Sequence, residues 1–346
     1  MTHSADKEER ILLIRNDKLG DFMLAWPSYA MLKKNIPNCT TFALVPEYTR
    51  EIAESCPWID QVLIDPGNSA GWRGVLKIRK SIRRHRIDAI ITLFSTTRIA
   101  FATLFVGARY RIAPATKFAQ LFYHNKITQR RSQSRKPEFE YNLDLVRAYL
   151  RNRKKATPTI EPAPPYFFFP AQQIHSLKEQ FLNREDINPE QKLIMIHPSS
   201  GGSASNLSHQ QYAELARKIT SDSNSYIILS AGPDEERLIQ EFSMLLKDVP
   251  HTIFISTAGL TSFAQHIAFV DLFVSGSTGP LHIAGALNRP TAAFYPRRKS
   301  ATALRWKTIN EQSRQLAFSP PEGAGEEEMS AISIQNVANT ICSHFL

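Results

Sequence analysis

The sequence predicts an α/β protein with two doubly wound domains, and three observations lead there. First, 346 residues are too many for one compact core and suit two. Second, short apolar runs alternate with helical patterns in both halves, which indicates parallel sheets. Third, residues 158–170 are rich in proline, cannot be helical and read as a linker. We therefore expect domains at 1–165 and 166–346, with a cleft at the carboxyl ends of both sheets, where such folds bind ligands.

In the N-terminal half, residues 11–15 form a short apolar run closed by polar residues and Gly20, which is typical of a buried parallel strand entering a loop. A helix is expected at 22–34, where Pro27 marks a kink or an early turn. Further strands are expected at 41–45, 62–64 and 89–93, and further helices at 48–55 and 74–86.

The C-terminal half repeats the alternation, and its last strand, 291–294, is expected to close the sheet. The other strands are expected at 193–196, 226–229, 252–255 and 272–274, and the helices at 208–220, 234–246, 260–268 and 281–287. Residues 330–345 form an amphipathic helix that could pack back on the N-terminal domain.

Composition excludes several classes of protein. Aliphatic, aromatic and Cys residues make up 42% and charged residues 21%, so the chain is neither disordered nor fibrous. No run approaches the roughly 18 apolar residues of a membrane span, and residues 1–10 lack the apolar region of a secretion signal. Three distant cysteines predict neither a disulfide framework nor a zinc site, so we expect a reducing compartment.

The excess positive charge lies entirely in the first half. Residues 1–165 hold 28 Lys and Arg against 15 Asp and Glu, a net charge of +13, whereas residues 166–346 carry −3. The basic residues cluster at 73–86 and 126–136. These clusters are either solvated surface or a face that meets a polyanion or an anionic membrane.

The loop after the first strand carries two carboxylates, Asp17 and Asp21. Gly20 permits a tight turn, and Asp21 stands where the next helix is expected to start. Asp21 is either the N-cap of that helix or a base that accepts a proton from a substrate hydroxyl, with Asp17 as the competing carboxylate. The common dinucleotide, P-loop, zincin and hydrolase motifs are absent from the sequence.

Two loops in the second half favour phosphate binding. Residues 197–203 follow a strand and include three serines and two glycines. This segment is either a phosphate-binding loop, whose N–H groups wrap phosphate oxygens, or a flexible surface loop. Ser277, Thr278 and Gly279 would present hydroxyl and N–H groups at a helix N-terminus, a suitable site for a diphosphate. His282 follows one turn later and is either structural or a phosphate contact. Glu235 either accepts hydrogen bonds from a ribose or caps a helix.

These residues resemble a known family. The opening Ile-Arg-Asn-Asp-Lys-Leu-Gly-Asp with Leu-x-x-Pro, the His-Pro-Ser-Ser-Gly-Gly loop, Glu-Tyr-Asn-Leu at 140–143, and Ser-Thr-Gly-Pro-Leu-His-Ile-Ala at 277–284 occur in the order typical of glycosyltransferase family 9. That family contains the ADP-heptose:lipopolysaccharide heptosyltransferases. The resemblance extends from about residue 11 to residue 306.

The resemblance implies a GT-B fold of two Rossmann-like domains and an inverting, metal-independent transfer of heptose from ADP-heptose to a lipopolysaccharide core. The partners would be a nucleotide sugar, bound by the C-terminal domain, and an anionic glycolipid acceptor, bound by the N-terminal domain. No cofactor is expected. The protein would be a cytoplasmic monomer in peripheral contact with the inner face of the inner membrane. Nucleic-acid binding is the weaker interpretation of the basic half, because no RNA- or DNA-binding motif, and no aromatic residues interleaved with the basic clusters, are found.

Roles carry over by position. Asp21 would be the general base that deprotonates the acceptor hydroxyl. The donor site would comprise Ser199, Ser200, Gly201, Glu235, Ala258, Gly259, Leu260, Ser277, Thr278, Gly279 and His282. The acceptor site would comprise Arg15, Lys18, Gly20, Arg130 and Arg131.

One departure from the family pattern concerns the donor. Heptosyltransferases often carry Lys-x-Trp-Pro after the first donor loop, but residues 205–208 read Ser-Asn-Leu-Ser. Either Lys18, Arg15 or a residue of the run 297–299 replaces this lysine, or the donor is a different nucleotide sugar used for another surface glycan. An inactive family member that acts as a scaffold is a third interpretation.

Overall fold

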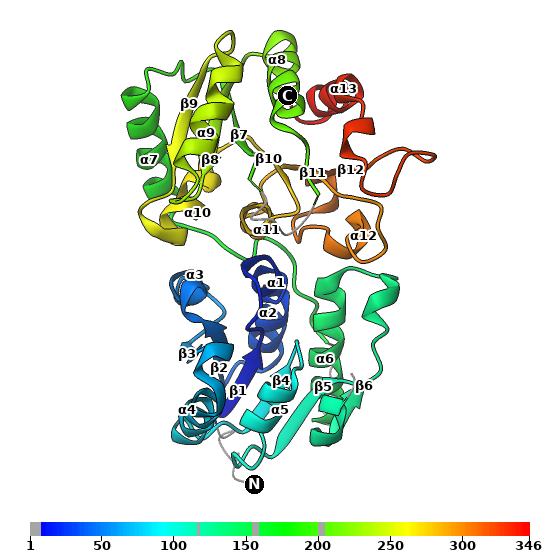
Figure 1. Cartoon of the computed structure of the whole chain (residues 1–346). Helices are drawn as coiled ribbons and strands as arrows, with labels where there is room; N and C mark the ends of the chain where they lie inside the picture. The colour runs from blue at the N-terminus through cyan, green and yellow to red at the C-terminus, as the bar shows by residue number, and fades with distance from the viewer. Residues whose placement is uncertain (1–7, 116–117, 154–158, 200–204) are drawn as a thin grey trace. The chain divides into compact units, whose positions relative to one another are not determined.

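The computed structural model describes residues 8–115, 118–153, 159–199 and 205–346 (Figure 1). The chain forms two compact units, which we call the N-terminal unit (1–131 with 138–166) and the C-terminal unit (132–137 with 167–346). The main division follows Tyr166, next to the boundary expected from the proline-rich stretch. Each unit is built around a six-stranded sheet.

The sheet of the N-terminal unit has the order β3-β2-β1-β4-β5-β6, and every pair of neighbours is parallel. On β1, the alternating side chains Ile11 to Ile14 are all buried, so both faces of the sheet must be covered by helices. The strands are β1 (Glu9–Ile14), β2 (Cys39–Pro46), β3 (Gln61–Asp65), β4 (Ala89–Thr92), β5 (Tyr110–Pro114) and β6 (Asn125–Ile127).

Helices of the N-terminal unit pack in pairs, α2 with α6 and α4 with α5. The helix expected at 22–34 is divided into two helices. Pro27 has no N–H to donate to the preceding turn, and its ring would clash with a carbonyl of that turn in a continuous helix. The helices are α1 (Leu19–Met23), α2 (Trp26–Asn35), α3 (Arg50–Glu54), α4 (Gly71–Arg84), α5 (Thr97–Ala102) and α6 (Glu138–Asn152).

The sheet of the C-terminal unit has the order β12-β11-β10-β7-β8-β9 and is also parallel throughout. The expectation that 291–294 closes the sheet was wrong, because the short strand β12 pairs outside it and is too exposed to show an apolar pattern. The strands are β7 (Lys192–His197), β8 (Ser225–Ala231), β9 (His251–Ile255), β10 (Leu272–Gly276), β11 (Thr291–Phe294) and β12 (Gln315–Phe318).

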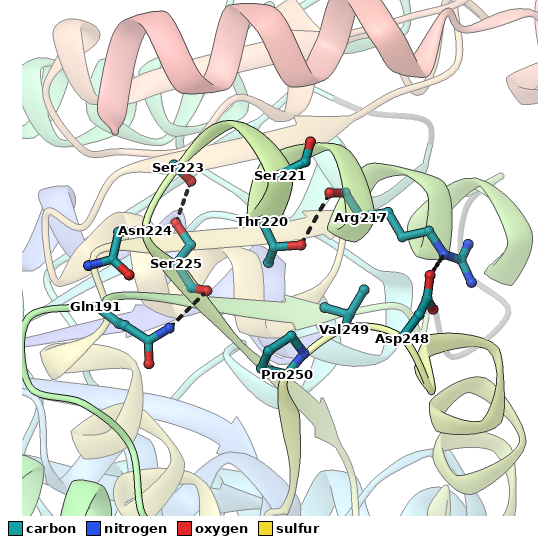
Figure 2. Close-up of a pocket in the computed structure, with 10 residues that line it drawn as sticks. All are labelled: Gln191, Arg217, Thr220, Ser221, Ser223, Asn224, Ser225, Asp248, Val249 and Pro250. Atoms are coloured by element: carbon teal, nitrogen blue, oxygen red, sulfur yellow. Dashed lines mark hydrogen bonds and ion pairs between the residues drawn. The ribbon is translucent and has the colours of Figure 1, made fainter.

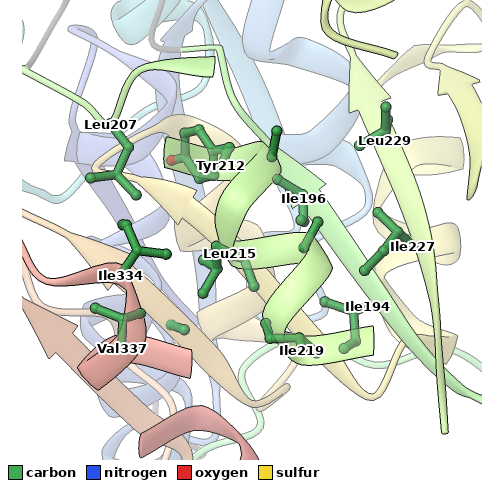
Figure 3. Packing of buried hydrophobic residues seen from close by; sticks show 14 of the residues in the cluster. Ile194, Ile196, Leu207, Tyr212, Leu215, Ile219, Ile227, Leu229, Ile334 and Val337 are labelled. Atoms are coloured by element: carbon green, nitrogen blue, oxygen red, sulfur yellow. The ribbon is translucent and has the colours of Figure 1, made fainter. Parts of the chain in front are cut away.

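One core cluster joins this sheet to α8 and α13 (Figure 3). The C-terminal helix α13 packs on α8 within the C-terminal unit, since Val337 and Ile341 are buried in that cluster. The helices are α7 (Ala171–Arg184), α8 (His209–Asp222), α9 (Glu236–Ser243), α10 (Gly259–Phe269), α11 (Gly279–Ala286), α12 (Ala303–Trp306) and α13 (Ile334–Phe345). Within the described residues, no helix combines the length and the apolar character needed to span a bilayer.

Strand order places the two candidate loops at equivalent positions in the two sheets. The chain order reverses between β1 and β4 in one sheet and between β7 and β10 in the other. Loops at the carboxyl ends of strands beside such a reversal form the ligand sites of open α/β sheets. Residues 15–21 follow β1, and residues 198–199 and 277–278 follow β7 and β10. Asp21, Ser199 and Thr278 therefore follow strands that border these reversals.

Candidate functional site

In the N-terminal unit, the site is organised around Arg15, the first residue after β1. Its side chain is only 2% exposed. The guanidinium donates to Asp17 (2.9 Å), to Asp21 and to Glu138 (2.8 Å), and more weakly to Asn142 (3.3 Å). Burial opposes the charge of Arg15, but the three carboxylates outweigh it and raise its pKa above the ordinary value. Arg15 is therefore a permanent cation that fixes the positions of these side chains.

Helix α6 supplies the opposite side of this network. Glu138, its first residue, is buried and accepts hydrogen bonds from both Arg15 and Arg131, the latter at 2.5 Å. One turn later, Asn142 donates to the backbone oxygen of Leu24 at 3.1 Å. The loop after β1 is thus held by a helix that begins more than a hundred residues later.

Of the three carboxylates bound to Arg15, Asp17 and Asp21 are partly exposed (18% and 14%), whereas Glu138 is buried. Asp21 lies at the third position of α1, whereas Lys18 is the N-cap, so the capping interpretation of Asp21 was wrong. Burial raises the pKa of Asp21 to about 6; Asp17 and Glu138 add to the increase and Arg15 opposes it. A carboxylate with this pKa is ionised at neutral pH and is well matched to accept a proton.

A second ionic contact supports the same loop. Asp65, at the end of β3, is buried and receives a bidentate pair from Arg98 together with a hydrogen bond from Asn16. Burial opposes the ionised form of Asp65, but these donors and the Gly67 N–H hold its pKa below the ordinary value. Asp65 at the end of β3 therefore joins the loop after β1, through a hydrogen bond, to helix α5, through an ion pair.

The predicted acceptor residues separate into two groups. Lys18 and Arg130 are exposed, and Gly20 lies in α1. Arg15 and Arg131 instead direct their donors at protein acceptors, Arg131 at Glu138 and Gln129. For Arg15 the burial leaves no surface for direct contact with an acceptor, so we correct its role to positioning of Asp21.

Sequence reasoning missed Glu138 and Asn142 as parts of this site. Two signals were available: a carboxylate beside a run of cations, and an Asn within the family motif at 140–143. Neither indicated which loop the helix would contact, because that pairing is tertiary.

In the C-terminal unit, the donor loops lie at one edge of the sheet. Neighbouring strands β7 and β10 place His197 opposite Ser275, so the residues that follow them lie together. The Ser199 hydroxyl is buried and has no hydrogen-bond partner among the described residues. Ser200 and Gly201, also predicted to bind the donor, lie outside the described residues.

Asn206 ties the two loops together. Its amide donates to the Pro198 carbonyl (2.8 Å), and its side-chain oxygen accepts from the Tyr212 hydroxyl (2.7 Å). This side chain covers Gly276: a Cβ at that glycine would lie 2.6 Å from the Asn206 oxygen. Asn206, in the stretch aligned with the missing lysine motif, therefore has a structural role.

Helix α11 begins where the diphosphate site was predicted. Thr278 is its N-cap and accepts from the Leu281 N–H (3.4 Å), and its hydroxyl is 3.0 Å from that of Ser275. Ser277 is partly exposed, and Gly279 opens the helix. His282 is buried one turn into α11, and its Nδ1 has no partner in the described part of the chain. Burial lowers the pKa of His282 to about 4, so its ring is neutral at physiological pH.

The remaining donor residues follow β8 and β9 at the same edge. Glu235 is the N-cap residue of α9, and its carboxylate accepts from the Gly232 N–H at 2.8 Å instead of from the helix. Ala258 is the N-cap residue of α10, and Gly259 has φ +90°, a backbone conformation that favours glycine. Leu260 follows in the first turn and is partly exposed.

A cavity of about 450 Å³ lies at the opposite edge of this sheet (Figure 2). Its lining includes Gln191, Ser225 and Pro250, which stand at the amino ends of β7, β8 and β9. An ion pair between Arg217 and Asp248 (2.7 Å) closes one side. No predicted site residue lines this cavity, so it is separate from the donor edge.

Comparison with known proteins agrees with this geometry. Residues 75–328 match the family model for glycosyltransferase family 9 (heptosyltransferase). A Haemophilus influenzae protein named "Putative glycosyltransferase" is 42% identical, over 95% of this chain and 94% of its own. The lipooligosaccharide heptosyltransferase 2 of the same organism is 24% identical over 82% of each chain. The structure of E. coli ADP-heptose lps heptosyltransferase II superposes with a TM-score of 0.72 at 18% identity, covering 96% of this chain and 98% of that one.

Fold and site together define an enzyme of the GT-B class, with two Rossmann-like units that each carry a loop cluster at the strand ends. The chain belongs to glycosyltransferase family 9 and is a glycosyltransferase related to the lipopolysaccharide heptosyltransferases.

Proposed function

We propose that this enzyme transfers a heptose from ADP-heptose to the lipopolysaccharide core, with inversion at the anomeric carbon and without a metal ion. The observation that carries the mechanism is the Asp21 carboxylate, held by Arg15 and with a pKa raised to about 6. The relatives named for heptosyl transfer support the choice of donor and acceptor.

Asp21 has the chemistry of the base. It takes the proton of an acceptor hydroxyl, whose oxygen then forms a bond to the anomeric carbon while the bond to the diphosphate breaks. Arg15 stays charged throughout and keeps the carboxylate oriented, because its other donors are bound to Asp17 and Glu138. One base is sufficient for an inverting displacement.

The departing diphosphate needs stabilisation, and the C-terminal unit offers neutral donors for it. The N-terminus of α11 contributes its helix dipole, and buried Ser199 and His282 each have a polar atom without a partner among the described residues. A ligand that bonds these atoms would satisfy them. Preorganised donors of this kind stabilise developing negative charge.

Two of the cations expected to hold the diphosphate are bound to carboxylates of the protein. Arg15 is committed to carboxylates, and Arg298 pairs with Glu327 at 2.9 Å. Lys18 and Lys299 are exposed. Arg297 is the best placed of the remaining candidates, because it follows β11 at the donor edge and its Nε is buried without a partner in the described ranges. Because Asn206 has a structural role where heptosyltransferases often carry the lysine motif, a different nucleotide sugar used for another surface glycan is the second candidate.

We also propose where the enzyme works and what it binds. The enzyme would work as a monomer, without a cofactor, on an anionic glycolipid at the cytoplasmic face of the inner membrane, where the +13 charge of residues 1–165 is complementary to the acceptor.

The test is transfer itself. The purified full chain is incubated with a heptose-free core glycolipid and, separately, with ADP-heptose, ADP-glucose and UDP-sugars, and products are read by mass spectrometry. A mass increase of one heptose from ADP-heptose alone, undiminished by EDTA, is the expected result, with Asp21→Asn as the inactive control. Transfer only from another donor would refute the heptose assignment and favour the second candidate.

A further inference from the structure

The longest basic stretch of the chain contains almost no acid. Between Asp65 and Glu138, residues 66–137 hold 16 Lys and Arg and one acidic residue, Asp88. Asp88 is already paired with Arg109 at 2.9 Å. Helix α4 carries the highest density of these cations, and its buried, cationic and apolar side chains lie on different faces.

Three faces of α4 can be distinguished. Val75, Ile78 and Ile82 are buried in the core of the N-terminal unit. The outward residues Arg73, Lys77, Lys80 and Arg84, which we call the cation stripe, recur at helical spacing and are exposed. None of the four forms an ion pair with a carboxylate of the described residues, so their charge is directed at solvent or a partner.

The third face of α4 carries large apolar side chains that the fold leaves in solvent. Trp72 is 59% exposed and Leu76 48% exposed, one turn apart and adjacent to the cation stripe. A group of large apolar side chains exposed on the surface of a protein commonly marks an interaction site.

Neighbouring elements extend this apolar face. Phe101 of α5 packs between the rings of Trp72 (6.4 Å) and Phe122 (4.7 Å), which connects α4 to the short helix at 118–122. Leu121 in that short helix is 72% exposed, and Phe105 after α5 is 77% exposed. The four exposed side chains Trp72, Leu76, Phe105 and Leu121 are called the apolar tips below.

Phe105 is held in place. Its φ is +54°, a left-handed conformation that is uncommon for a bulky residue, and its carbonyl accepts from Arg83 of α4 at 2.7 Å. Arg79 donates in the same way to the Phe101 carbonyl at 2.6 Å. The cations of α4 therefore fix the segment that exposes Phe105.

We propose that the apolar tips and the cation stripe together dock the protein on an anionic lipid bilayer, with the apolar tips in the interface and the cations at the headgroups. A basic amphipathic surface with Trp, Phe and Leu beside Lys and Arg has the composition of interfacial membrane anchors. This deepens the proposed function, because a lipid-linked acceptor would then be presented at the surface where the enzyme binds.

A nucleic acid is the other polyanion to weigh. The sequence showed no aromatic residues interleaved with the cations, but the structure places Trp72 and Phe105 next to them, where bases could stack. Leu76 and Leu121 have no planar face on which a base could stack, however, and they account for half of the apolar tips. Lipid accounts for all four.

The test is co-sedimentation of the full chain with vesicles of phosphatidylcholine alone or mixed with phosphatidylglycerol. We expect binding to the mixed vesicles only, weakened by salt. Lys77→Gln with Lys80→Gln should lower the affinity by about fivefold per cation. Trp72→Ser with Leu76→Ser should lower it further and should abolish quenching of tryptophan fluorescence by brominated lipid.

The matched control is Met244→Ser with Lys247→Gln in the C-terminal unit, which also pairs an exposed apolar residue (63% exposed) with an exposed cation. It should bind like the unchanged protein, and circular dichroism should show all variants folded. Equal binding by every variant, or equal binding to neutral vesicles, would overturn the proposal. Duplex or single-stranded DNA bound through the same residues, with no vesicle binding, would replace it with nucleic-acid recognition.

Failure of the proposed transferase function would give a different result from failure of membrane docking. Transfer to a water-soluble, lipid-free acceptor fragment does not depend on docking, so loss of docking leaves it unchanged. Vesicle binding without any transfer would refute the transferase assignment and leave the docking surface intact.

Discussion

The side chains of Arg15 and Glu138, 123 residues apart in the sequence, meet at 2.8 Å in the interior of the N-terminal unit. Around this contact one guanidinium faces three carboxylates, of which Asp21 is the candidate base. Excess negative charge in a poorly solvated site makes ionisation of Asp21 more difficult, in the same direction as its burial. Burial is the main cause of the raised pKa of Asp21; Arg15 opposes the increase and Glu138 adds to it.

Asp21→Asn should abolish transfer and make the protein more stable. Loss of a general base lowers kcat by about 10²–10⁴-fold. The folded-state pKa of about 6 lies above the reference value of 3.8, so the carboxyl group stabilises the fold at low pH and this contribution is lost as pH rises from about 4 to 6. A neutral Asn avoids the loss, worth up to about 3 kcal/mol at pH 7. Single-turnover kinetics and thermal unfolding at pH 4.5 and 7.5 check both parts.

In the same experiment, we expect the Tm of Asp21→Asn to exceed that of the unchanged protein by more at pH 7.5 than at pH 4.5. An equal difference at both pH values would contradict the raised pKa, and a retained kcat would contradict the role as base.

Glu138→Gln should shift the acid limb of the pH–rate profile to lower pH. Glu138 raises the pKa of Asp21 by charge, so a neutral side chain of the same shape lets Asp21 ionise at lower pH. The fold should also weaken by about 3 kcal/mol or more, because Arg15 and Arg131 lose a buried carboxylate. The log of kcat/KM against pH, measured below the unfolding temperature of the variant, gives the shift.

Glu140→Gln is the matched control for that variant. Glu140 lies on the same helix and pairs with Arg147 at 2.9 Å, away from Asp21. Its replacement should leave the acid limb where it is in the unchanged protein. A shift of the same size in both variants would mean that Glu138 acts through general stability of α6.

The alternation of strands and helices was readable from the sequence because parallel strands buried on both faces are continuous apolar runs. Ile11 to Ile14 is such a run, and it became β1. β12 was missed because this edge strand is too exposed to form an apolar run, and α7 because no capping side chain marks its start after the proline-rich stretch. Pro27 was recognised, but whether it kinks or divides a helix depends on the surrounding packing.

For the site, the sequence indicated which loops take part but not which side chains bind one another. Strand-end position and residue type were enough to select Asp21 and Thr278. Arg15 was placed in the acceptor site through the family resemblance, and only the structure shows its buried contacts with Glu138 and Asn142. Asn206 was noted only as part of the stretch that lacks the lysine motif, because its contact with Gly276 joins segments far apart in the sequence.

Gly276→Ala should weaken donor binding and stability together. The new Cβ would overlap the Asn206 amide, which is tied to Pro198 and Tyr212, so the donor loops must move. Overpacking of this kind costs about 1–3 kcal/mol. Isothermal titration with a nucleoside diphosphate and chemical unfolding measure the two effects. In an Asn206→Ala background the same change should cost less, and strict additivity of the two substitutions would exclude the clash as the cause.

Arg297→Gln should raise the KM for the nucleotide-sugar donor by about 10–100-fold with a smaller effect on the KM for the acceptor. The reason is that Arg297, after β11, is the best-placed candidate cation for the diphosphate in the described part of the C-terminal unit, and a charge-assisted hydrogen bond contributes about 1.5–3 kcal/mol. Its guanidinium also donates to the Ala324 carbonyl at 3.0 Å, so thermal unfolding must accompany the kinetics. Arg298→Gln is the matched control: that side chain is 54% exposed and pairs with Glu327, and its removal should leave both KM values unchanged. If Arg297→Gln also leaves the donor KM unchanged while the fold is intact, the diphosphate is held without this cation, and the neutral donors of α11 and Ser199 must account for its binding.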